Sequence, residues 1–289
     1  MIDFTAKDYD MPHSKAWCPG CGHFLVHKIL REAIAEMKMS PDNIVFVSGI
    51  GQAAKMPQYI KGHMFNGLHG RALPAAMAIK ASNPQLEVIV NSGDGCLYGE
   101  GGNHFLAQIE RNSDITVFAH NNMIYGLTKG QGSPTSPKGL VTPVQIDGVT
   151  NETFNPLAVA IAMGATFVAR VFPGNAEQTK HVFKEAIKHR GFALVDMFVQ
   201  CVSMNKTNTF KWYKENTYEL DADHNQGDKI AAFTRALQSD PYPTGIFFKE
   251  NQKATFEENC AAYKNNSQPL YERDFDMKKL KKLIDARRE

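Results

Sequence analysis

Short apolar runs alternate with helical segments over the first two thirds of the chain. The apolar runs have the length of strands and end in turn residues, at 44–47, 86–90, 115–119, 165–171 and 192–199. Around and between them, apolar residues recur three and four positions apart, over about 23–37, 70–82, 102–111, 156–163 and 176–189. Buried strands that alternate with helices are typical of a parallel sheet covered on both faces. The pattern therefore predicts an α/β fold with a doubly wound, mostly parallel sheet.

The pattern changes after residue 205. Aromatic residues interrupt a polar stretch, and a helix, a proline-rich link and a charged closing helix follow, at 206–225, 227–238, 241–243 and 277–288. We therefore predict a main domain at 1–205 and a C-terminal appendage at 206–289 that packs on the domain or on a partner subunit. The basic end of the closing helix is interpreted as a solvated face rather than a binding patch.

Composition narrows the class of protein. The 289 residues are 43% hydrophobic and 21% charged, as in soluble globular proteins, and the net charge of +2 provides no basic field for nucleic acid. No apolar run approaches the roughly 20 residues of a membrane helix, and the N-terminus is polar and acidic, unlike a secretory signal. We therefore expect a cytoplasmic protein. The five cysteines are an odd count, which favours reduced thiols or metal ligands over disulfides.

Polar side chains follow two of the predicted strands. Ser92-Gly93-Asp94-Gly95 follows one strand, and Asn121-Asn122 follows the next. An aspartate and an asparagine at strand ends can bind Mg²⁺ through oxygen, together with phosphates, and glycines let the backbone approach a diphosphate. Ligands of parallel sheets lie beyond the carboxyl ends of the strands. The Gly49-Ile50-Gly51 turn, Asp94, Asn122 and Cys201 are therefore expected to converge at one edge.

The spacing of the two polar segments resembles a known motif. Gly93-Asp94-Gly95 precedes Asn121-Asn122 by a gap of 25 residues, as in the thiamine diphosphate motif of the transketolase and 2-oxoacid decarboxylase families. The resemblance implies that Asp94, Asn122 and the backbone carbonyl of Ile124 bind Mg²⁺, which holds the diphosphate of thiamine diphosphate. It also implies the thiamine diphosphate-binding fold for the main domain. The competing interpretation is two ordinary turns of an α/β sheet.

Four further segments narrow the family. They are WCPGCGH at 17–23, LHGRA at 68–72, IYGLTKGQ at 124–131 and SPTS at 133–136. Together they resemble the β subunit of 2-oxoacid:ferredoxin oxidoreductases, and the resemblance runs from about residue 12 to 205. It is close to the 2-oxoglutarate-type branch, because pyruvate-type relatives usually carry asparagine where this chain has Leu127.

This resemblance implies an activity and a set of partners. Such enzymes decarboxylate a 2-oxoacid oxidatively, transfer the acyl group to coenzyme A and reduce ferredoxin, and with a low-potential donor they run backwards and fix CO2. An α subunit supplies the glutamate that activates the cofactor, so we expect a heterodimer or a dimer of heterodimers, with the β subunit alone inactive. The implied cofactor residues are Gly49, Ile50, Gly51, His69, Gly93, Asp94, Gly95, Asn122, Ile124, Gly126 and Leu127.

Catalytic roles are expected for His69, Lys55 and Leu127. His69 precedes a predicted helix, where an imidazole can meet a phosphate or the substrate at the helix N-terminus. Lys55 is a candidate partner for a substrate carboxylate or for an acid of the partner chain. Lys129 lies near Leu127 in the loop after the asparagine pair and could face ferredoxin or substrate. The alternative roles are a buried or capping histidine and solvated lysines.

Cys18-x-x-Cys21 has the spacing of metal ligands. The residues alone leave zinc, a redox dithiol and an iron–sulfur cluster open, although zinc sites usually show a second such pair or paired histidines. The family resemblance implies a [4Fe–4S] cluster, with a third cysteine after the Gly-Ile-Gly turn and a fourth after the last strand. Cys201 fits the fourth position, but Gln52 stands where the family has the third cysteine.

Gln52 leaves four alternatives for this site, because an amide is a poor, hard ligand for iron. Cys96 supplies the missing thiolate, or an oxygen, a histidine or a solvent ligand completes the iron. Alternatively the cluster is [3Fe–4S], or there is no cluster. The candidate histidines are His23, His63 and His69. Cys260, in the appendage, is interpreted as a packing residue or a free thiol.

Other functions compete with an oxidoreductase subunit of the 2-oxoglutarate type. One is a non-oxidative thiamine diphosphate-dependent decarboxylase or acyl transferase in which the cysteines are structural, and another is a pyruvate-type enzyme. An iron–sulfur electron carrier is a third, but it has no use for Asp94 and Asn122. The last is a structural subunit without chemistry of its own.

Overall fold

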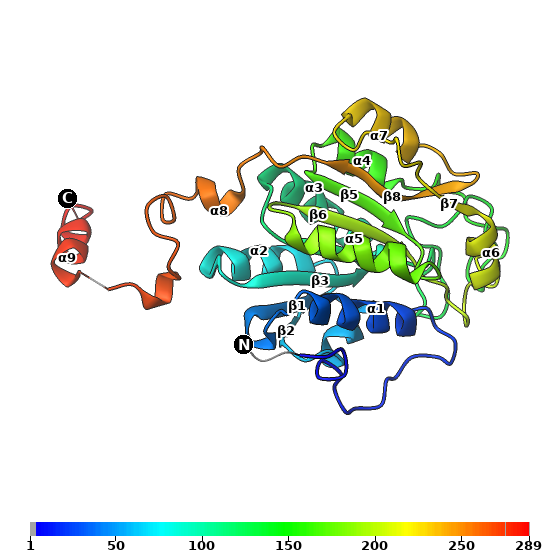
Figure 1. Cartoon of the computed structure of the whole chain (residues 1–289), viewed down its shortest axis with the longest axis horizontal. Coiled ribbons are helices and arrows are strands. Elements are labelled where there is room, and N and C mark those ends of the chain that lie inside the picture. Colours follow the sequence, from blue (N-terminus) through cyan, green and yellow to red (C-terminus); the bar gives the residue numbers. More distant parts are fainter. Residues whose placement is uncertain (1–3, 275, 289) are drawn as a thin grey trace.

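The computed structural model describes residues 4–274 and 276–288. Within these residues an eight-stranded sheet has the strand order β2-β1-β3-β4-β6-β5-β8-β7 (Figure 1). Its strands are β1 (Ile44–Ser48), β2 (His63–Asn66), β3 (Glu87–Gly93), β4 (Thr116–Asn121), β5 (Phe167–Val171), β6 (Ala193–Phe198), β7 (Thr217–Glu219) and β8 (Tyr242–Lys249). All pairs are parallel except β5 with β8. The prediction of a mostly parallel α/β sheet is confirmed.

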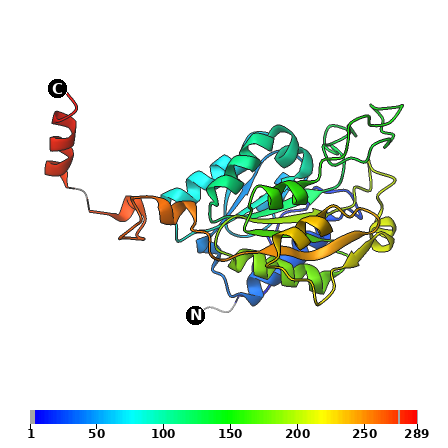
Figure 2. The same cartoon turned by 90° about the horizontal axis from the view of Figure 1, so that it is seen from above.

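Helices cover both faces of the sheet (Figure 2). One face carries α1 (His23–Glu36) and α5 (Ala176–Lys188), and the other carries α2 (Ala72–Ser82), α3 (Gly102–Arg111), α4 (Pro156–Ala162) and α7 (Lys229–Ala236). Strand β1 shows why both faces must be covered, because its buried side chains point alternately to one face of the sheet and to the other. Phe46 packs with the first group of helices and Val47 with the second. Each such fully buried side chain stabilises the fold by about 1.5–3 kcal/mol.

The sequence pattern does not predict strands β2, β7 and β8, which lie at or near the edges of the sheet. All four residues of β2 are exposed, so this strand lacks the long run of apolar residues that marks a buried strand. The interpretation of 241–243 as a proline-rich link is wrong, because these residues enter β8, whose interior is buried. Prolines argue against strands in general, but the apolar residues that follow pair with β5. The segment predicted as an appendage therefore contributes β7 and β8 to the main sheet.

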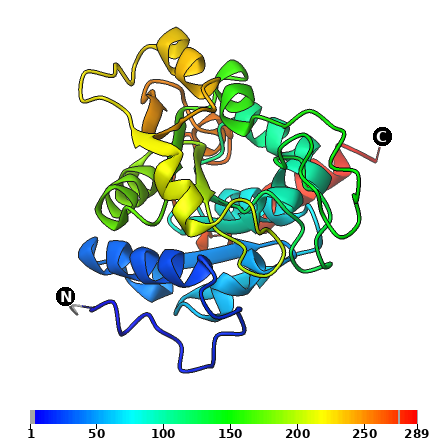
Figure 3. The same ribbon diagram turned by 90° about the vertical axis from the view of Figure 1, so that its right-hand side faces the viewer.

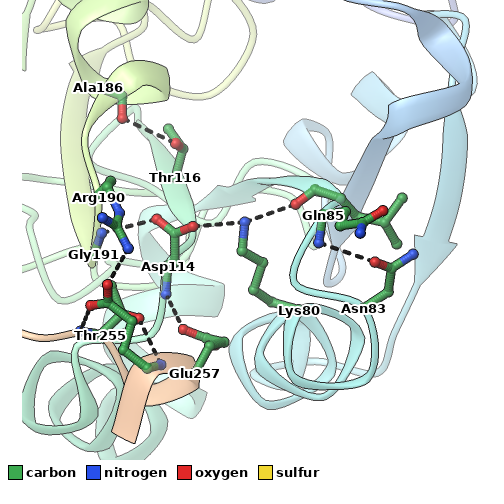
Figure 4. A network of polar contacts seen from close by, with 12 residues as sticks. Lys80, Asn83, Gln85, Asp114, Thr116, Ala186, Arg190, Gly191, Thr255 and Glu257 are labelled. Atoms are coloured by element: carbon green, nitrogen blue, oxygen red, sulfur yellow. Dashed lines mark hydrogen bonds and ion pairs between the residues drawn. The ribbon is translucent and has the colours of Figure 1, made fainter. Parts of the chain in front are cut away.

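Asp114 connects the main domain to the chain that follows β8 (Figure 4). Its backbone N–H donates to Glu257 Oε2 at 3.1 Å, and its carboxylate accepts from the N–H of Gly191 at 2.9 Å. The same carboxylate lies 2.7 Å from Lys80 Nζ. Glu257 belongs to the short helix α8 (Phe256–Asn259), which begins with a capping box. These contacts fix α8 on the domain.

Beyond α8, the Tyr263 hydroxyl donates to the Ala81 carbonyl at 2.6 Å, and the chain then extends away from the domain to its last helix (Figures 1 and 2). It contains η4 (Leu270–Glu272) and α9 (Met277–Asp285), in which none of the described residues is buried. Within α9, Leu283 and Ile284 are exposed apolar residues. Across residues 4–274 and 276–288, every helix is too short or too polar to cross a membrane. The remaining elements are η1 (Pro41–Asn43), η2 (Ala53–Gln58), the π-helical η3 (Gly95–Glu100) and α6 (Phe210–Glu215).

Candidate active site

The carboxyl ends of β1, β3 and β4 meet at one edge of the sheet, which faces the viewer in Figure 3. A cavity of about 520 Å³ lies there, which we call the cofactor cavity. All the predicted cofactor residues line it except Gly49. The lining residues without a predicted cofactor role are His23, Gln52, Ala53, Cys96, His120, Tyr125 and Thr128.

Asp94 follows β3 and is only 2% exposed. Its Oδ2 accepts hydrogen bonds from Thr135 Oγ1, at 2.7 Å, and from the hydroxyl of Ser133. Burial raises the pKa of Asp94 to about 6, while these hydroxyls and the backbone N–H of Asn122 act in the opposite direction. A buried carboxylate oriented in this way is suited to a divalent cation. The sequence pattern assigns Ser133 and Thr135 no role of their own, although the SPTS segment contains both.

The two asparagines after β4 have different surroundings. Asn121 is buried; its Nδ2 donates to both oxygens of Asp196 at 3.2 Å, and its Oδ1 lies 2.8 Å from Thr135 Oγ1. Asn122 lines the cofactor cavity, and its Oδ1 accepts from the N–H of Ile124 at 3.0 Å. The first asparagine therefore supports the site from behind. The second lies with Asp94 and Ile124 at the cavity, as expected for a ligand set.

The glycines at this edge make room for neighbouring side chains. A Cβ at Gly95 would lie 2.2 Å from the Tyr125 ring, and one at Gly49 would lie 2.3 Å from Cys96 Sγ. Gly51 has a φ of +111°, which side-chain-bearing residues rarely adopt. Gly95 and Gly49 are thus required by close packing. Their expected approach to a diphosphate stays a prediction.

His69 lies at the cavity with a carboxylate behind it. Its Nδ1 is 3.1 Å from Glu100 Oε2, and the same oxygen accepts from the Tyr125 hydroxyl at 3.2 Å. Glu100 ends η3, the π-helical turn that begins directly after Asp94. Such turns are frequent at functional sites. The π turn therefore places Glu100 where it can orient the His69 ring.

Two histidines stack between the cavity and the interior. The rings of His23 and His120 have centroids 5.0 Å apart and an interplanar angle of 9°. His23 Nδ1 lies 3.0 Å from Cys21 Sγ, and His120 Nε2 lies 3.0 Å from Asn91 Oδ1. Burial lowers the pKa of His23 to about 4 and that of His120 well below its usual value. Both rings are therefore neutral at pH 7, which allows them to stack.

A second cavity of about 400 Å³ adjoins the first, and we call it the cysteine cavity. It is lined by Cys18, Cys21 and Cys201 together with Gln52. The residues that line both cavities are His23, Gln52, Asn122 and Gly126. The structure thus brings the three predicted cluster cysteines together beside the cofactor cavity.

The thiols of the cysteine cavity have polar neighbours. Cys18 Sγ accepts from the Ser203 hydroxyl at 3.0 Å, and Cys201 Sγ accepts from the N–H of Met204 at 3.4 Å. Burial raises the pKa of Cys21 to about 11. A thiolate at Cys21 therefore requires a positive charge beside it, such as a bound metal.

Cys96 does not line the cysteine cavity. Its Sγ lies at the cofactor cavity and accepts from the backbone N–H groups of Gly70, at 3.2 Å, and Ile50, at 3.4 Å. The thiol is 3% exposed and packs against the Gly49 backbone. The structure therefore places this candidate apart from the other three cysteines.

Comparisons with known proteins agree with this geometry. Residues 46–197 match the family described as thiamine pyrophosphate enzyme, C-terminal TPP binding domain. Residues 201–265 match the family described as the C-terminal part of the pyruvate ferredoxin oxidoreductase beta subunit. A 2-oxoacid:ferredoxin oxidoreductase subunit beta from Saccharolobus solfataricus is 40% identical over 259 residues, which cover 85% of each chain. The chain belongs to the β subunits of 2-oxoacid:ferredoxin oxidoreductases.

Further relatives identify the branch of this enzyme family. The 2-oxoglutarate oxidoreductase subunit KorB of Mycobacterium tuberculosis is 37% identical over 213 residues, 74% of this chain and 57% of the relative. A solved structure of 2-oxoglutarate:ferredoxin oxidoreductase from Magnetococcus marinus, with 2-oxoglutarate, coenzyme A and succinyl-CoA bound, superposes with a TM-score of 0.91. That match has 33% identity and covers 98% of this chain and 97% of the other. The subunit is of the 2-oxoglutarate type.

The remaining candidates of this β subunit are spread around the site. Leu127 lines the cofactor cavity and is 44% exposed. Lys55 Nζ donates to the Ala16 carbonyl at 3.0 Å, outside the cavity lining. Lys129 is exposed, and His63 lies on edge strand β2, with Nε2 3.2 Å from the Asp42 carbonyl. Catalytic roles for Lys55 and Leu127 stay predictions.

The described residues contain no preformed side-chain site for a single metal ion. Among the described residues, no group of three or more His, Cys, Asp or Glu side chains is arranged to hold one metal ion. Asp94 and Asn122 share the cofactor cavity with the Ile124 backbone, and the three cysteines surround a space instead of a point.

Proposed function

We propose that this chain is the catalytic β subunit of a 2-oxoglutarate:ferredoxin oxidoreductase, with Mg²⁺–thiamine diphosphate in the cofactor cavity and an iron–sulfur cluster in the cysteine cavity. The observation that carries the proposal is that the two cavities share walls at Gln52, Asn122 and Gly126. A site for carbon chemistry and a site for electron transfer are thus adjacent. The order of the chain supports this, because the ends of β3, β4 and β6 supply Asp94, Asn122 and Cys201.

The residues of the cofactor cavity fit a metal–diphosphate group. Asp94, Asn122 and the Ile124 carbonyl are all-oxygen donors, which Mg²⁺ prefers. Ser133 and Thr135 hold the Asp94 carboxylate in place. When bound, thiamine diphosphate supplies the nucleophilic carbon for decarboxylation of a 2-oxoacid. The chain supplies the cation site and the cavity around it.

His69 is the candidate for proton transfer or phosphate contact. Glu100 Oε2 lies 3.1 Å from Nδ1 and places a carboxylate beside the ring, although Nδ1 has no hydrogen-bond partner among the described residues. Tyr125 fixes Glu100 in turn. Leu127 presents an apolar side chain to the same cavity and is the candidate for discrimination between 2-oxoacids.

The cysteine cavity fits a cluster bound mainly by thiolates. Cys18, Cys21 and Cys201 come from the segment before α1 and the segment after β6. Iron–sulfur clusters are bound by such thiolates and transfer single electrons. The neighbouring His23 is neutral and buried, so it adds no charge to the wall between the cavities.

The proposed partners are an α subunit, ferredoxin and coenzyme A. In the heterodimer or dimer of heterodimers, the α subunit supplies the glutamate that activates the cofactor. Exposed apolar residues on edge strand β2 and on α9, such as Met64, Phe65 and Leu283, are candidate contacts. We propose a cytoplasmic complex that runs in either direction, including CO2 fixation.

The test is reconstitution with the α subunit under anaerobic conditions. We expect reduction of a viologen dye or ferredoxin that requires both 2-oxoglutarate and coenzyme A, is faster than with pyruvate, and is absent for the β subunit alone. Decarboxylation without dye reduction would support the non-oxidative alternative. Oxidation of 2-oxoglutarate by the β subunit alone would contradict the proposal.

A further inference from the structure

Gln52 stands at the boundary between the two cavities. It directly precedes η2 (Ala53–Gln58) and lines both the cofactor cavity and the cysteine cavity. Its backbone carbonyl accepts from Trp17 Nε1 at 2.9 Å, which ties it to the segment that carries Cys18. Its side-chain Oε1 is buried and, among the described residues, has no hydrogen-bond partner. A buried oxygen without a hydrogen-bond partner destabilises the fold, and a bound group that contacts it would remove this penalty.

The cysteine cavity offers three thiols. A four-iron cluster bound entirely by cysteine requires four. Cys18, Cys21 and Cys201 line this cavity. Two buried side-chain atoms of its other lining residues have no hydrogen-bond partner among the described residues, Gln52 Oε1 and His23 Nε2. A cluster in the cavity would therefore have one iron without a cysteine.

Cys96 is unsuited to that position. Its Sγ already accepts two backbone N–H groups, from Ile50 and Gly70, on the side of the cofactor cavity. It also packs against Gly49 so closely that a Cβ there would lie 2.3 Å away. Moving the thiol to the cysteine cavity would break both hydrogen bonds and displace the turn after β1.

His23 is unsuited for a different reason. Its Nδ1 lies 3.0 Å from Cys21 Sγ, so this edge of the ring already contacts a cysteine of the cavity. The ring stacks on His120, with centroids 5.0 Å apart, and on Trp17, with centroids 5.4 Å apart. Its Nε2 is also buried without a hydrogen-bond partner among the described residues. It lies on the ring edge away from Nδ1 and Cys21, and stacking on both faces holds the ring in that orientation.

We propose that Gln52 completes a three-thiolate iron–sulfur site, with its Oε1 bound to the one iron that lacks a cysteine. This inference rests on the proposed function, since it assumes a cluster in the cysteine cavity. An amide oxygen is a harder and weaker ligand for iron than a thiolate. An iron bound through Gln52 would therefore be the most weakly held, and Gln52 also lines the cofactor cavity.

Weak binding of one iron predicts a defined oxidation product. Ferricyanide takes one electron from a [4Fe–4S]²⁺ cluster and becomes ferrocyanide. The cluster then releases one Fe²⁺ and becomes [3Fe–4S]⁺, so iron, sulfide and charge balance. A cluster with four thiolates holds its fourth iron more firmly, so the same mild treatment leaves it intact.

The experiment uses the complex of this chain with its α subunit, purified anaerobically. The variants are Gln52→Cys, which adds a fourth thiolate, Gln52→Ala, which removes the oxygen, and Cys96→Ser as the matched control, which removes the thiol and keeps an acceptor for the Ile50 and Gly70 N–H groups. Iron and acid-labile sulfide are measured before and after one equivalent of ferricyanide, and EPR detects the three-iron cluster. A Cys201→Ser complex gives the background from any cluster in the other subunit. Binding of thiamine diphosphate verifies that each variant is folded.

The expected results separate the variants. After subtraction of the background, the wild type holds roughly four irons and loses one on oxidation, with the three-iron EPR signal. Gln52→Cys keeps its iron and gives no such signal. Gln52→Ala shows the signal before oxidation, and Cys96→Ser behaves as the wild type does.

Three results would overturn the inference while leaving the proposed function intact. The first is a wild type as resistant as Gln52→Cys, the second is a Gln52→Ala complex that retains iron as the wild type does, and the third is loss of iron in Cys96→Ser. If Gln52→Cys does not fold, the iron content of the other two variants still tests the inference. A wild-type complex that binds thiamine diphosphate but holds no iron above background contradicts the proposed function itself.

Discussion

The two cavities of this subunit share a wall but are built in different ways. The cofactor cavity lies on strand ends, and its central carboxylate, Asp94, already has hydroxyl partners. The cysteine cavity is lined mainly by the segments before α1 and after β6, and burial raises the pKa of its Cys21 to about 11, so a thiolate there requires a bound positive charge. The first site is therefore organised before its ligand binds. The second is completed by what it binds, so its residues are expected to be more sensitive to loss of that group.

If the cavities have separate roles, each can be disabled without the other. A substitution in the cofactor cavity should remove thiamine diphosphate and leave iron in place. A substitution in the cysteine cavity should do the reverse. Both should abolish electron transfer to a dye, because the reaction requires both sites.

The largest effect is expected for Asp94→Asn. The substitution removes the one carboxylate of the proposed cation site, so binding of Mg²⁺–thiamine diphosphate by the complex should weaken on the order of a hundredfold or more. Iron content should not change. Since Asp94 is 2% exposed, loss of its buried charge should leave the melting temperature of the metal-free complex equal or higher.

Calorimetric titration with thiamine diphosphate and Mg²⁺, together with a melting curve, measures this effect. The control is Asp147→Asn, an exposed carboxylate in the long loop after β4. A variant that melts well below the wild type would indicate that Asp94 is mainly structural. Unchanged affinity would remove the cation site from the proposal.

Cys201→Ser should have the opposite profile. It removes a thiolate from the cysteine cavity, so iron and dye reduction should be lost from the complex. Binding of thiamine diphosphate should change less than about twofold, because the strand ends are untouched. The matched control is Cys260→Ser, at the end of α8 and outside both cavities. Full iron content in Cys201→Ser, measured by iron and sulfide analysis, would contradict the assignment.

The sequence predicted those features that depend on strand ends. Apolar runs locate β1, β3, β4 and β6, and the carboxyl ends of parallel strands must meet at one edge. Asp94, Asn122 and Cys201 follow directly from that rule. The Gly49-Ile50-Gly51 turn and the Cys18-x-x-Cys21 pair are recognised from residues that lie close together in the sequence. The fold and the positions of most candidate ligands were therefore predictable.

The remaining features depend on contacts between distant segments. His23 and His120 stack although one begins α1 and the other lies in β4, and no local pattern pairs them. Thr135 reaches Asp94 from a long polar loop. Strand β2 is exposed at every position, and β8 begins among prolines, so neither has the expected pattern. These features depend on tertiary packing, which the local sequence pattern does not reveal.

An intermediate effect is expected for Thr135→Val, which keeps the shape and removes the hydroxyl. The Thr135 Oγ1 lies 2.7 Å from Asp94 Oδ2 and 2.8 Å from Asn121 Oδ1, and its single proton serves one acceptor at a time. Loss of a bond to a charged acceptor costs about 1.5–3 kcal/mol, so cofactor affinity should fall roughly tenfold to a hundredfold. Iron content should stay unchanged.

Titration of this variant is compared with Thr142→Val, whose buried hydroxyl bonds within its own loop to Gln145. Equal affinities for the two variants would show that the hydroxyl does not orient Asp94. Loss of iron in Thr135→Val would show that the two cavities are coupled through the loop and do not have separate roles.

The smallest effect is expected for Leu127→Asn, which addresses substrate choice inside the cofactor cavity. Leu127 is 44% exposed and lines the cavity without a hydrogen-bond role, so its replacement should leave cofactor binding and iron unchanged. A single side chain in a pocket contributes about 1 kcal/mol to discrimination. The ratio of kcat/KM for 2-oxoglutarate to that for pyruvate should therefore fall about fivefold.

Dye reduction by the reconstituted complex measures this ratio with both substrates, and Val144→Asn, exposed in the same loop but outside the cavity, is the control. An unchanged ratio would place the choice of 2-oxoacid elsewhere, in the α subunit or in the His69–Glu100 pair. A fall in kcat for both substrates by the same factor would instead assign Leu127 to closure of the cavity. Only a change in the ratio, with iron and cofactor affinity constant, supports a selective contact between Leu127 and the substrate.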